Sequence, residues 1–131
     1  MPGLMPTVLV VEDDKPTADV VSMLLQAEGC VVKHVLNGQH CLEYVNFEKP
    51  DLIILDIMMP VMDGYTTATH LAANPETRGI PIIIFSARSE QMVDVFQMSA
   101  NVVDYVQKPF ELDDLRGRVR KILNARLPPV P

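Results

Sequence analysis

The sequence predicts a doubly wound α/β fold, in which a parallel sheet of five strands is covered by helices on both faces. Two observations predict it. Five short apolar runs, rich in β-branched residues, recur along the 131 residues without alternating polar positions. Such runs are typical of strands that are buried on both faces of a parallel sheet. A longer segment with apolar residues at helical spacing follows each run, so strand and helix alternate five times.

The expected strands begin with the run TVLVV and continue with four runs of similar length. They comprise Thr7–Val11, Val31–Val35, Leu52–Leu55, Ile80–Phe85 and Val102–Val106. The second run is weaker than the others, and Asp104 interrupts the fifth. A chain of this length suits one compact domain built on a single sheet.

The expected helices lie between and after these runs. They comprise Pro16–Glu28, Gln39–Asn46, Tyr65–Asn74, Ser89–Met98 and Leu112–Ala125. Asp14 is the expected N-cap of the first helix, and Gly29 is its natural end. On the last helix we expect one apolar stripe of Leu112, Leu115, Val119 and Ile122. We expect a domain over residues 7–126, a disordered N-terminus over residues 1–6 and a disordered, proline-rich tail over residues 127–131.

The composition excludes several classes of partner. The net charge is −6 and no basic stripe is visible, which argues against direct binding of nucleic acid. No segment reaches membrane-spanning length and no signal-peptide pattern opens the chain, so we expect a cytoplasmic protein without membrane contact. Cys30 and Cys41 are too few for a disulfide framework, and we expect reduced, partly buried thiols.

Residues that can carry chemistry stand where the expected strands end. Glu12 and Asp13 follow the first strand and Asp56 follows the third, whereas Ser86 and Lys108 follow the fourth and fifth. Ligands of open α/β sheets bind beyond the carboxyl ends of the strands. Taken singly, these residues have ordinary interpretations as helix caps, loop residues or solvated charges. Their co-occurrence at strand ends predicts one shared site.

The residue types in this predicted site match the parts that phosphoryl transfer needs. Neighbouring carboxylates repel one another, and a magnesium ion relieves that repulsion because it prefers oxygen ligands. A carboxylate can also attack phosphorus as a nucleophile and form an acyl phosphate. Positioning and charge neutralisation then come from a metal, an ammonium group and a hydroxyl or backbone N–H. The nucleophile, metal ligand, hydroxyl and ammonium would be Asp56, Asp13, Ser86 and Lys108.

Four segments carry a resemblance to a known family. They are VLVVEDD (Val8–Asp14), PDLIILDIMMPVMDGY (Pro50–Tyr65), PIIIFSAR (Pro81–Arg88) and DYVQKPF (Asp104–Phe110). With these segments in this order, the chain resembles the receiver domain of response regulators in two-component phosphorelay signalling, from about residue 7 to residue 125. The resemblance implies a flavodoxin-like sheet with the strand order 2-1-3-4-5.

The resemblance also implies a phosphoacceptor site that binds Mg²⁺ or Mn²⁺. Asp56 is similar to the family's phosphoacceptor, and Lys108 is similar to its phosphoryl-binding lysine. Asp13 resembles the direct metal ligand and Glu12 the second acid, while Asp56 and the backbone carbonyl of Met58 would complete the protein's share of the metal shell. Met58 offers no polar side-chain group to orient an attacking water, so we expect modest rather than fast loss of the phosphoryl group.

Further positions match the family's switch. Ser86 occupies the position of the switch hydroxyl and Tyr105 that of the switch aromatic; Ser86 would bond a phosphoryl oxygen and Tyr105 would fill the vacated space. Lys108–Pro109 would be a cis peptide. Gly64 would let the third helix begin close to the active-site loop, and Asn101 stands where the family often has glycine, with a tolerance for the same left-handed backbone.

The partners implied by the resemblance are a phosphodonor and a downstream target. The phosphodonor would be a sensor histidine kinase or a phosphotransfer protein. The output face would consist of the fourth expected helix, the fifth strand and the last helix, where Met92, Val95 and Phe96 are expected on the face or in the packing beneath it. That face would control a downstream protein and could support a phosphorylation-dependent dimer. The domain would catalyse only its own phosphorylation and dephosphorylation.

Two alternatives remain beside this interpretation. A haloacid-dehalogenase-type phosphatase also uses an aspartate nucleophile with magnesium, but it needs a second aspartate where Met58 stands. A receiver-like scaffold could bind partners without phosphorylation, although the acid pair, Asp56 and Lys108 argue against it. No output domain follows the last expected helix, which fits both a stand-alone regulator and a segment of a longer protein. The histidines show no ligand spacing and receive no role; they are His34, His40 and His70.

Overall fold

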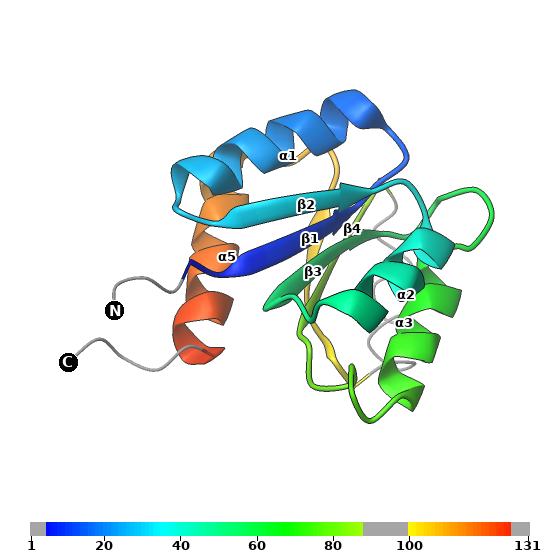
Figure 1. Cartoon of the computed structure of the whole chain (residues 1–131). Helices are drawn as coiled ribbons and strands as arrows, with labels where there is room; N and C mark the ends of the chain where they lie inside the picture. The colour runs from blue at the N-terminus through cyan, green and yellow to red at the C-terminus, as the bar shows by residue number, and fades with distance from the viewer. Residues whose placement is uncertain (1–4, 88–99, 127–131) are drawn as a thin grey trace.

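The computed structural model describes residues 5–87 and 100–126, and these form one sheet flanked by helices (Figure 1). The strands are β1 (Thr7–Val11), β2 (Val31–Val35), β3 (Leu52–Asp56), β4 (Ile82–Ser86) and β5 (Val102–Gln107). All neighbours pair in parallel in the order β2-β1-β3-β4-β5, which confirms the predicted strand order. The helices are α1 (Lys15–Ala27), α2 (Gly38–Phe47), α3 (Gly64–Ala73) and α5 (Leu112–Arg126). The helix expected at Ser89–Met98, with Met92, Val95 and Phe96, lies outside the described residues.

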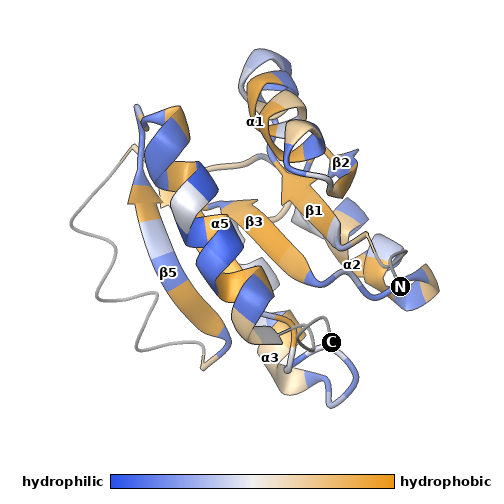
Figure 2. Ribbon diagram, turned by 90° about the vertical axis from the view of Figure 1, so that its left-hand side faces the viewer, coloured by the Kyte–Doolittle hydropathy of each residue, from blue (hydrophilic) through white to orange (hydrophobic). Residues whose placement is uncertain are grey.

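Within the described residues, α1 and α5 pack on one face of the sheet and α2 and α3 on the other, because successive side chains of a strand point to opposite faces. Val8 and Val10 of β1 pack with residues of α1 and α5, whereas Leu9 and Val11 pack with residues of α2 and α3. Figure 2 shows β1 and β3 as largely hydrophobic ribbons between helices of mixed character. Helices on both faces confirm the doubly wound arrangement.

Local signals set both ends of α1 as expected. The carboxylate of Asp14 accepts a hydrogen bond from the backbone N–H of Thr17 at 3.1 Å and caps the helix start. At the other end Gly29 has a φ of 90°, and the N–H of Cys30 donates to the carbonyl of Leu25 at 3.0 Å. Glycine adopts positive φ without a steric penalty, so the helix stops there.

The start of β4 and the buried stripe of α5 differ from the sequence-based expectation. β4 begins at Ile82 instead of Ile80, because Pro81 has no N–H to give to a neighbouring strand. The buried stripe of α5 consists of Leu115, Val119 and Leu123, with Ile122 partly buried. Leu112 is half exposed, so its expected place in the stripe is wrong; it opens the helix before the turn at which Leu115 meets the core.

The two cysteines lie in the core of the protein. Cys30 and Cys41 are free and buried, and burial raises the pKa of Cys41 to about 12. Among the described helices, none combines the length and the apolar character that a bilayer crossing requires.

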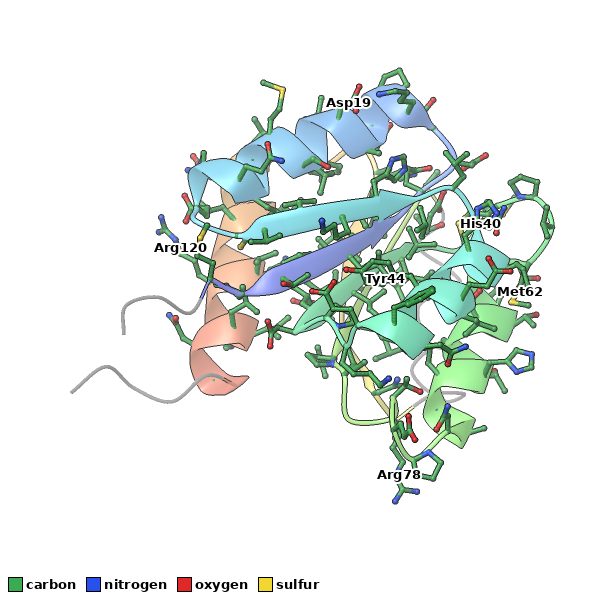
Figure 3. All side chains as sticks on the ribbon, in the orientation of Figure 1. Asp19, His40, Tyr44, Met62, Arg78 and Arg120 are labelled. Atoms are coloured by element: carbon green, nitrogen blue, oxygen red, sulfur yellow. The ribbon has the colours of Figure 1, made fainter. Side chains whose placement is uncertain are left out.

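The loop between β3 and α3 contains a strained residue. Its Met62 carbonyl accepts a hydrogen bond from the N–H of Gly38 at 3.4 Å, and Figure 3 shows Met62 beside the first turn of α2, near His40. Val61 has a φ of 70° and is 81% exposed. Within residues 5–87 and 100–126 it is the only non-glycine residue with positive φ, so Asn101 does not adopt the left-handed conformation suggested by the resemblance. A β-branched side chain in that conformation is strained.

Val61→Asn is expected to stabilise the folded protein by about 1 kcal/mol, because asparagine tolerates the left-handed conformation that costs valine roughly 1–2 kcal/mol. Urea unfolding of the two proteins measures the difference. Val20→Asn is the matched control, since Val20 is a half-exposed valine within α1 and has no such strain to relieve. A Val61→Asn protein no more stable than the wild type would show that the loop stores no usable strain.

Candidate functional site

The acidic residues that follow separate strands meet at the carboxyl end of the sheet. Because β1 and β3 are neighbours in the sheet, Glu12 and Asp13 after β1 come close to Asp56 at the end of β3. One carboxylate oxygen of each residue lies within 4.8 Å of the others. Glu12 is fully buried and Asp56 is only 4% exposed, whereas Asp13 is exposed. The structure therefore brings together all three side chains that sequence analysis assigned to a metal.

Lys108 joins this cluster from the loop after β5. Its Nζ lies 2.6 Å from Oε1 of Glu12 and 3.3 Å from Oδ2 of Asp56. The ammonium group also stands 4.5 Å from the centroid of the Phe85 ring. The Lys108 N–H donates to the Ser86 carbonyl at 2.7 Å, and the Lys108–Pro109 peptide is cis. The lysine thus approaches two carboxylates that come from different strands.

Burial and neighbouring charges together set the pKa values of Asp13 and Lys108. Partial burial raises the pKa of Asp13 above 3.8, and the neighbouring Glu12 carboxylate raises it further. Burial lowers the pKa of Lys108, but the hydrogen bond to Glu12 and the charges of Asp56 and Glu12 outweigh that effect and leave it above 10.5. The lysine therefore stays charged at neutral pH, and ionisation of Asp13 is less favourable in the folded protein than in a free aspartate.

Backbone contacts hold the acid side chains in place. The N–H of Met58 donates to Oδ1 of Asp56 at 3.3 Å, and the N–H of Asp14 donates to Oε2 of Glu12 at 3.0 Å. A Cβ on Gly64 would stand 2.4 Å from the carbonyl oxygen of Asp56, closer than real contacts allow. Only glycine permits α3 to start this close to the end of β3, as sequence analysis expected.

Ser86 and Tyr105 lie at the same end of the sheet, on β4 and β5. Ser86 is fully buried and follows Phe85, which is the register partner of Asp56. Tyr105 is the register partner of Ile84, is 8% exposed and belongs to the apolar cluster on the α2–α3 face. Both residues therefore stand close in register to the acid site, and both are buried.

Sequence reasoning missed a contact between His34 and the site. Nε2 of His34 lies 2.8 Å from the backbone carbonyl oxygen of Glu12, and sequence analysis gave His34 no role. The contact depends on the pairing of β1 with β2, in which His34 is the partner of Val10. No ligand-like spacing in the sequence indicates this contact. The only signal is that His34 lies near the end of an expected strand, and so near the edge of the sheet that carries the site.

The donor set fits a divalent cation. All three side chains offer carboxylate oxygens, the ligands that Mg²⁺ prefers, and two of the three residues are buried. Within the described residues, Lys108 is the only cation that the structure pairs with them, so three ionised carboxylates would keep an excess of negative charge. A bound divalent ion would neutralise that excess.

Asp13→Asn is expected to stabilise the metal-free protein at neutral pH and to weaken Mg²⁺ binding. Because the pKa of Asp13 is raised on folding, its ionisation costs stability: the cost is absent below pH 3.8 and grows as the pH rises through the folded-state pKa. In a chelator, the variant's gain in melting temperature should therefore be larger at neutral pH than below pH 3.8. An equal gain at both pH values would contradict this account.

The fold and the site define a doubly wound α/β protein with an acidic, lysine-containing site at its strand ends. The family model of the response regulator receiver domain matches residues 8–120. The chain belongs to this family, the receiver domains of two-component signalling.

Curated relatives and solved structures agree with this membership. The chain is 35% identical over 127 residues to the phosphate regulon transcriptional regulatory protein PhoB of Rhizobium meliloti, covering 97% of this chain and 56% of that protein. It is 36% identical over 121 residues to the transcriptional regulatory protein PrrA of Mycobacterium leprae, covering 92% of this chain and 51% of that protein. The chain thus spans about half the length of these relatives.

Among solved structures, a putative response regulator from Chloroflexus aurantiacus has a TM-score of 0.86 and 31% identity, covering 92% of this chain and 99% of that chain. The receiver domain of the sensor histidine kinase PA1611 from Pseudomonas aeruginosa has a TM-score of 0.83 and 26% identity, covering 92% of this chain and 99% of that one. The latter structure has a magnesium ion coordinated in its active site cleft.

Proposed function

We propose that this chain is a Mg²⁺-dependent phosphoacceptor switch, in which Asp56 takes a phosphoryl group from a sensor histidine kinase or a phosphotransfer protein. One observation carries the proposal. Asp56 is a buried carboxylate that has an ammonium group 3.3 Å from its Oδ2 and oxygens of two further carboxylates within 4.8 Å. A nucleophile, a fixed positive charge and a cation site in one place are the parts of phosphoryl transfer to aspartate.

The chain's own residues would hold the reacting groups. An oxygen of Asp56 attacks phosphorus, the bond from phosphorus to the donor breaks, and the electron pair leaves with the donor. The N–H of Met58 and the ammonium of Lys108 bind opposite oxygens of the carboxylate and fix its orientation. Glu12, Asp13, Asp56 and the Met58 carbonyl would hold Mg²⁺ or Mn²⁺, which would supply positive charge to the phosphoryl oxygens. The domain would catalyse only its own phosphorylation and dephosphorylation.

The proposed switch runs through Ser86 and Tyr105. Ser86 would move toward a phosphoryl oxygen, and Tyr105 would occupy the space behind it. Tyr105 is only 8% exposed in this structure. We therefore propose that the structure resembles the arrangement in which the ring points inward, and that the ring is exposed to solvent in the other arrangement. Phosphorylation would then shift the balance between two positions of one aromatic side chain.

The output surface would consist of β5, α5 and the expected fourth helix. That helix falls within residues 88–99, which connect β4 to β5 in the sequence. On this surface Nη1 of Arg118 lies 2.6 Å from Oδ1 of Asp104, and its Nε lies 3.1 Å from Oδ2 of Asp114. A downstream protein, or a second phosphorylated copy, would bind there and respond to the position of Tyr105, which lies on the same strand as Asp104.

Incubation with a small acyl phosphate, followed by intact-mass measurement, tests the proposal. With Mg²⁺ present, the protein should gain one phosphoryl group, and in a chelator it should gain none. Turnover of a phosphomonoester would support a phosphatase instead. A folded protein that never gains a phosphoryl group would support a scaffold that acts without phosphorylation.

A further inference from the structure

Met58 is an exposed methionine whose backbone contacts the proposed phosphoacceptor. The residue is 52% exposed, and it lines a hollow of about 450 Å³ together with Asp13, Asp63 and Tyr65. Its backbone N–H donates to Oδ1 of Asp56 at 3.3 Å. A chemical change at this side chain would therefore occur at the mouth of the acid site.

The other exposed methionines of the described residues lack this relation to the site. Met5 precedes β1, and Met23 lies on α1; both are more than half exposed, and neither lines the hollow that contains Asp13. Met59 also lines this hollow, but it is partly buried against the apolar cluster on the α2–α3 face, so an oxidant reaches it less easily than Met58. The molecule thus provides matched methionines that an oxidant can reach but that stand away from Asp56.

We propose that Met58 is a peroxide-sensitive modification site that shortens the lifetime of phosphorylated Asp56, an inference that rests on the proposed phosphoacceptor function. The thioether sulfur of Met58 attacks one oxygen of hydrogen peroxide, the O–O bond breaks, and the products are a sulfoxide and water. The sulfur loses two electrons and the peroxide gains them. Methionine sulfoxide reductases reverse this change, so the modification can act as a signal.

The exposed position of Met58 decides what its oxidation does. A sulfoxide in a core disrupts packing, but a half-exposed side chain keeps its new polar oxygen in water, so the fold survives. The sulfoxide oxygen is a hydrogen-bond acceptor, which the thioether is only weakly. In the hollow beside Asp13 it can orient a water molecule toward the phosphorylated carboxylate. One such hydrogen bond, made in the transition state, corresponds to about fivefold faster hydrolysis.

The experiment treats the full chain with hydrogen peroxide, maps sulfoxides by peptide mass, and then follows loss of the phosphoryl group after loading with a small acyl phosphate. We expect oxidation of Met58, and about fivefold faster loss than in untreated protein. Methionine sulfoxide reductase should restore the original rate. Met58→Leu should lose the phosphoryl group at one rate before and after peroxide, each sample being compared with its own untreated state.

Met23→Leu is the control for oxidation elsewhere, and it should respond to peroxide as the wild type does. Equal rates of phosphoryl loss in treated and untreated wild type, with Met58 oxidised, would overturn the inference. A faster loss after peroxide that persists in Met58→Leu would overturn it as well. Peptides in which Met23 is oxidised and Met58 is not would also contradict it. These outcomes leave the phosphoacceptor role intact. Failure of the untreated protein to take up a phosphoryl group would overturn both proposals.

Discussion

Asp56→Asn is expected to abolish uptake of a phosphoryl group from a small acyl phosphate and to leave the protein folded. An amide has almost the shape of the carboxylate, but it lacks the negative charge that makes the oxygen a nucleophile toward phosphorus. The amide oxygen can still accept the N–H of Met58, and Lys108 keeps its contact of 2.6 Å with Glu12. Intact mass after incubation with donor and Mg²⁺ measures uptake, and thermal unfolding monitors the fold.

Asp19→Asn is the matched control for this change. Asp19 lies on the exposed surface of α1 (Figure 3), where Lys15 pairs with it at 3.1 Å, away from the acid cluster. The control should take up one phosphoryl group as the wild type does. If Asp56→Asn still gains a phosphoryl group, another side chain accepts it, and the modified peptide identifies which one.

Much of this fold could be predicted from the sequence because a buried parallel strand needs apolar residues on both faces. The run LIIL predicts β3 almost to the residue; only its last position, Asp56, was assigned to the following loop. Ends of elements are less predictable, because they depend on single hydrogen bonds. Pro81 shifts the start of β4 by removing one donor, and Leu112 opens α5 without reaching the core.

The candidate site could be predicted as a set of residue types but not as a set of contacts. Parallel strands with neighbouring ends make the meeting of Asp13 and Asp56 foreseeable. The contact of His34 with the carbonyl of Glu12 depends on the register between β1 and β2, and the position of Lys108 over Phe85 depends on side-chain conformations. The spacing of residues along one chain determines neither the register between strands nor the rotamers of side chains. The strain at Val61 is equally invisible, since valine carries no signal of positive φ.

Lys108→Met is expected to weaken phosphoryl uptake, to destabilise the metal-free protein and to strengthen Mg²⁺ binding. The variant keeps an unbranched side chain of similar length but removes the cation that lies 2.6 Å from buried Glu12 and 3.3 Å from Asp56. Removing one partner of a largely buried ion pair should cost about 2 kcal/mol, since Lys108 keeps some solvent contact that reduces the loss. The lysine and a bound metal both neutralise the same carboxylates, so without the lysine the cluster should bind Mg²⁺ more tightly.

The pH dependence separates this electrostatic effect from a general loss of packing. Since the pKa of Lys108 is raised on folding, its contribution to stability is fully present below pH 10.5 and is lost as the pH rises through the folded-state pKa. The stability gap between wild type and Lys108→Met should therefore be constant at neutral pH and narrow in strongly alkaline solution. Urea unfolding in a chelator measures the gap, and titration with Mg²⁺ measures the change in affinity. Lys15→Met is the control, because the exposed pair of Lys15 with Asp19 contributes little. A variant that loses affinity for Mg²⁺ would mean that the lysine organises the carboxylates for the metal and does not compete with it.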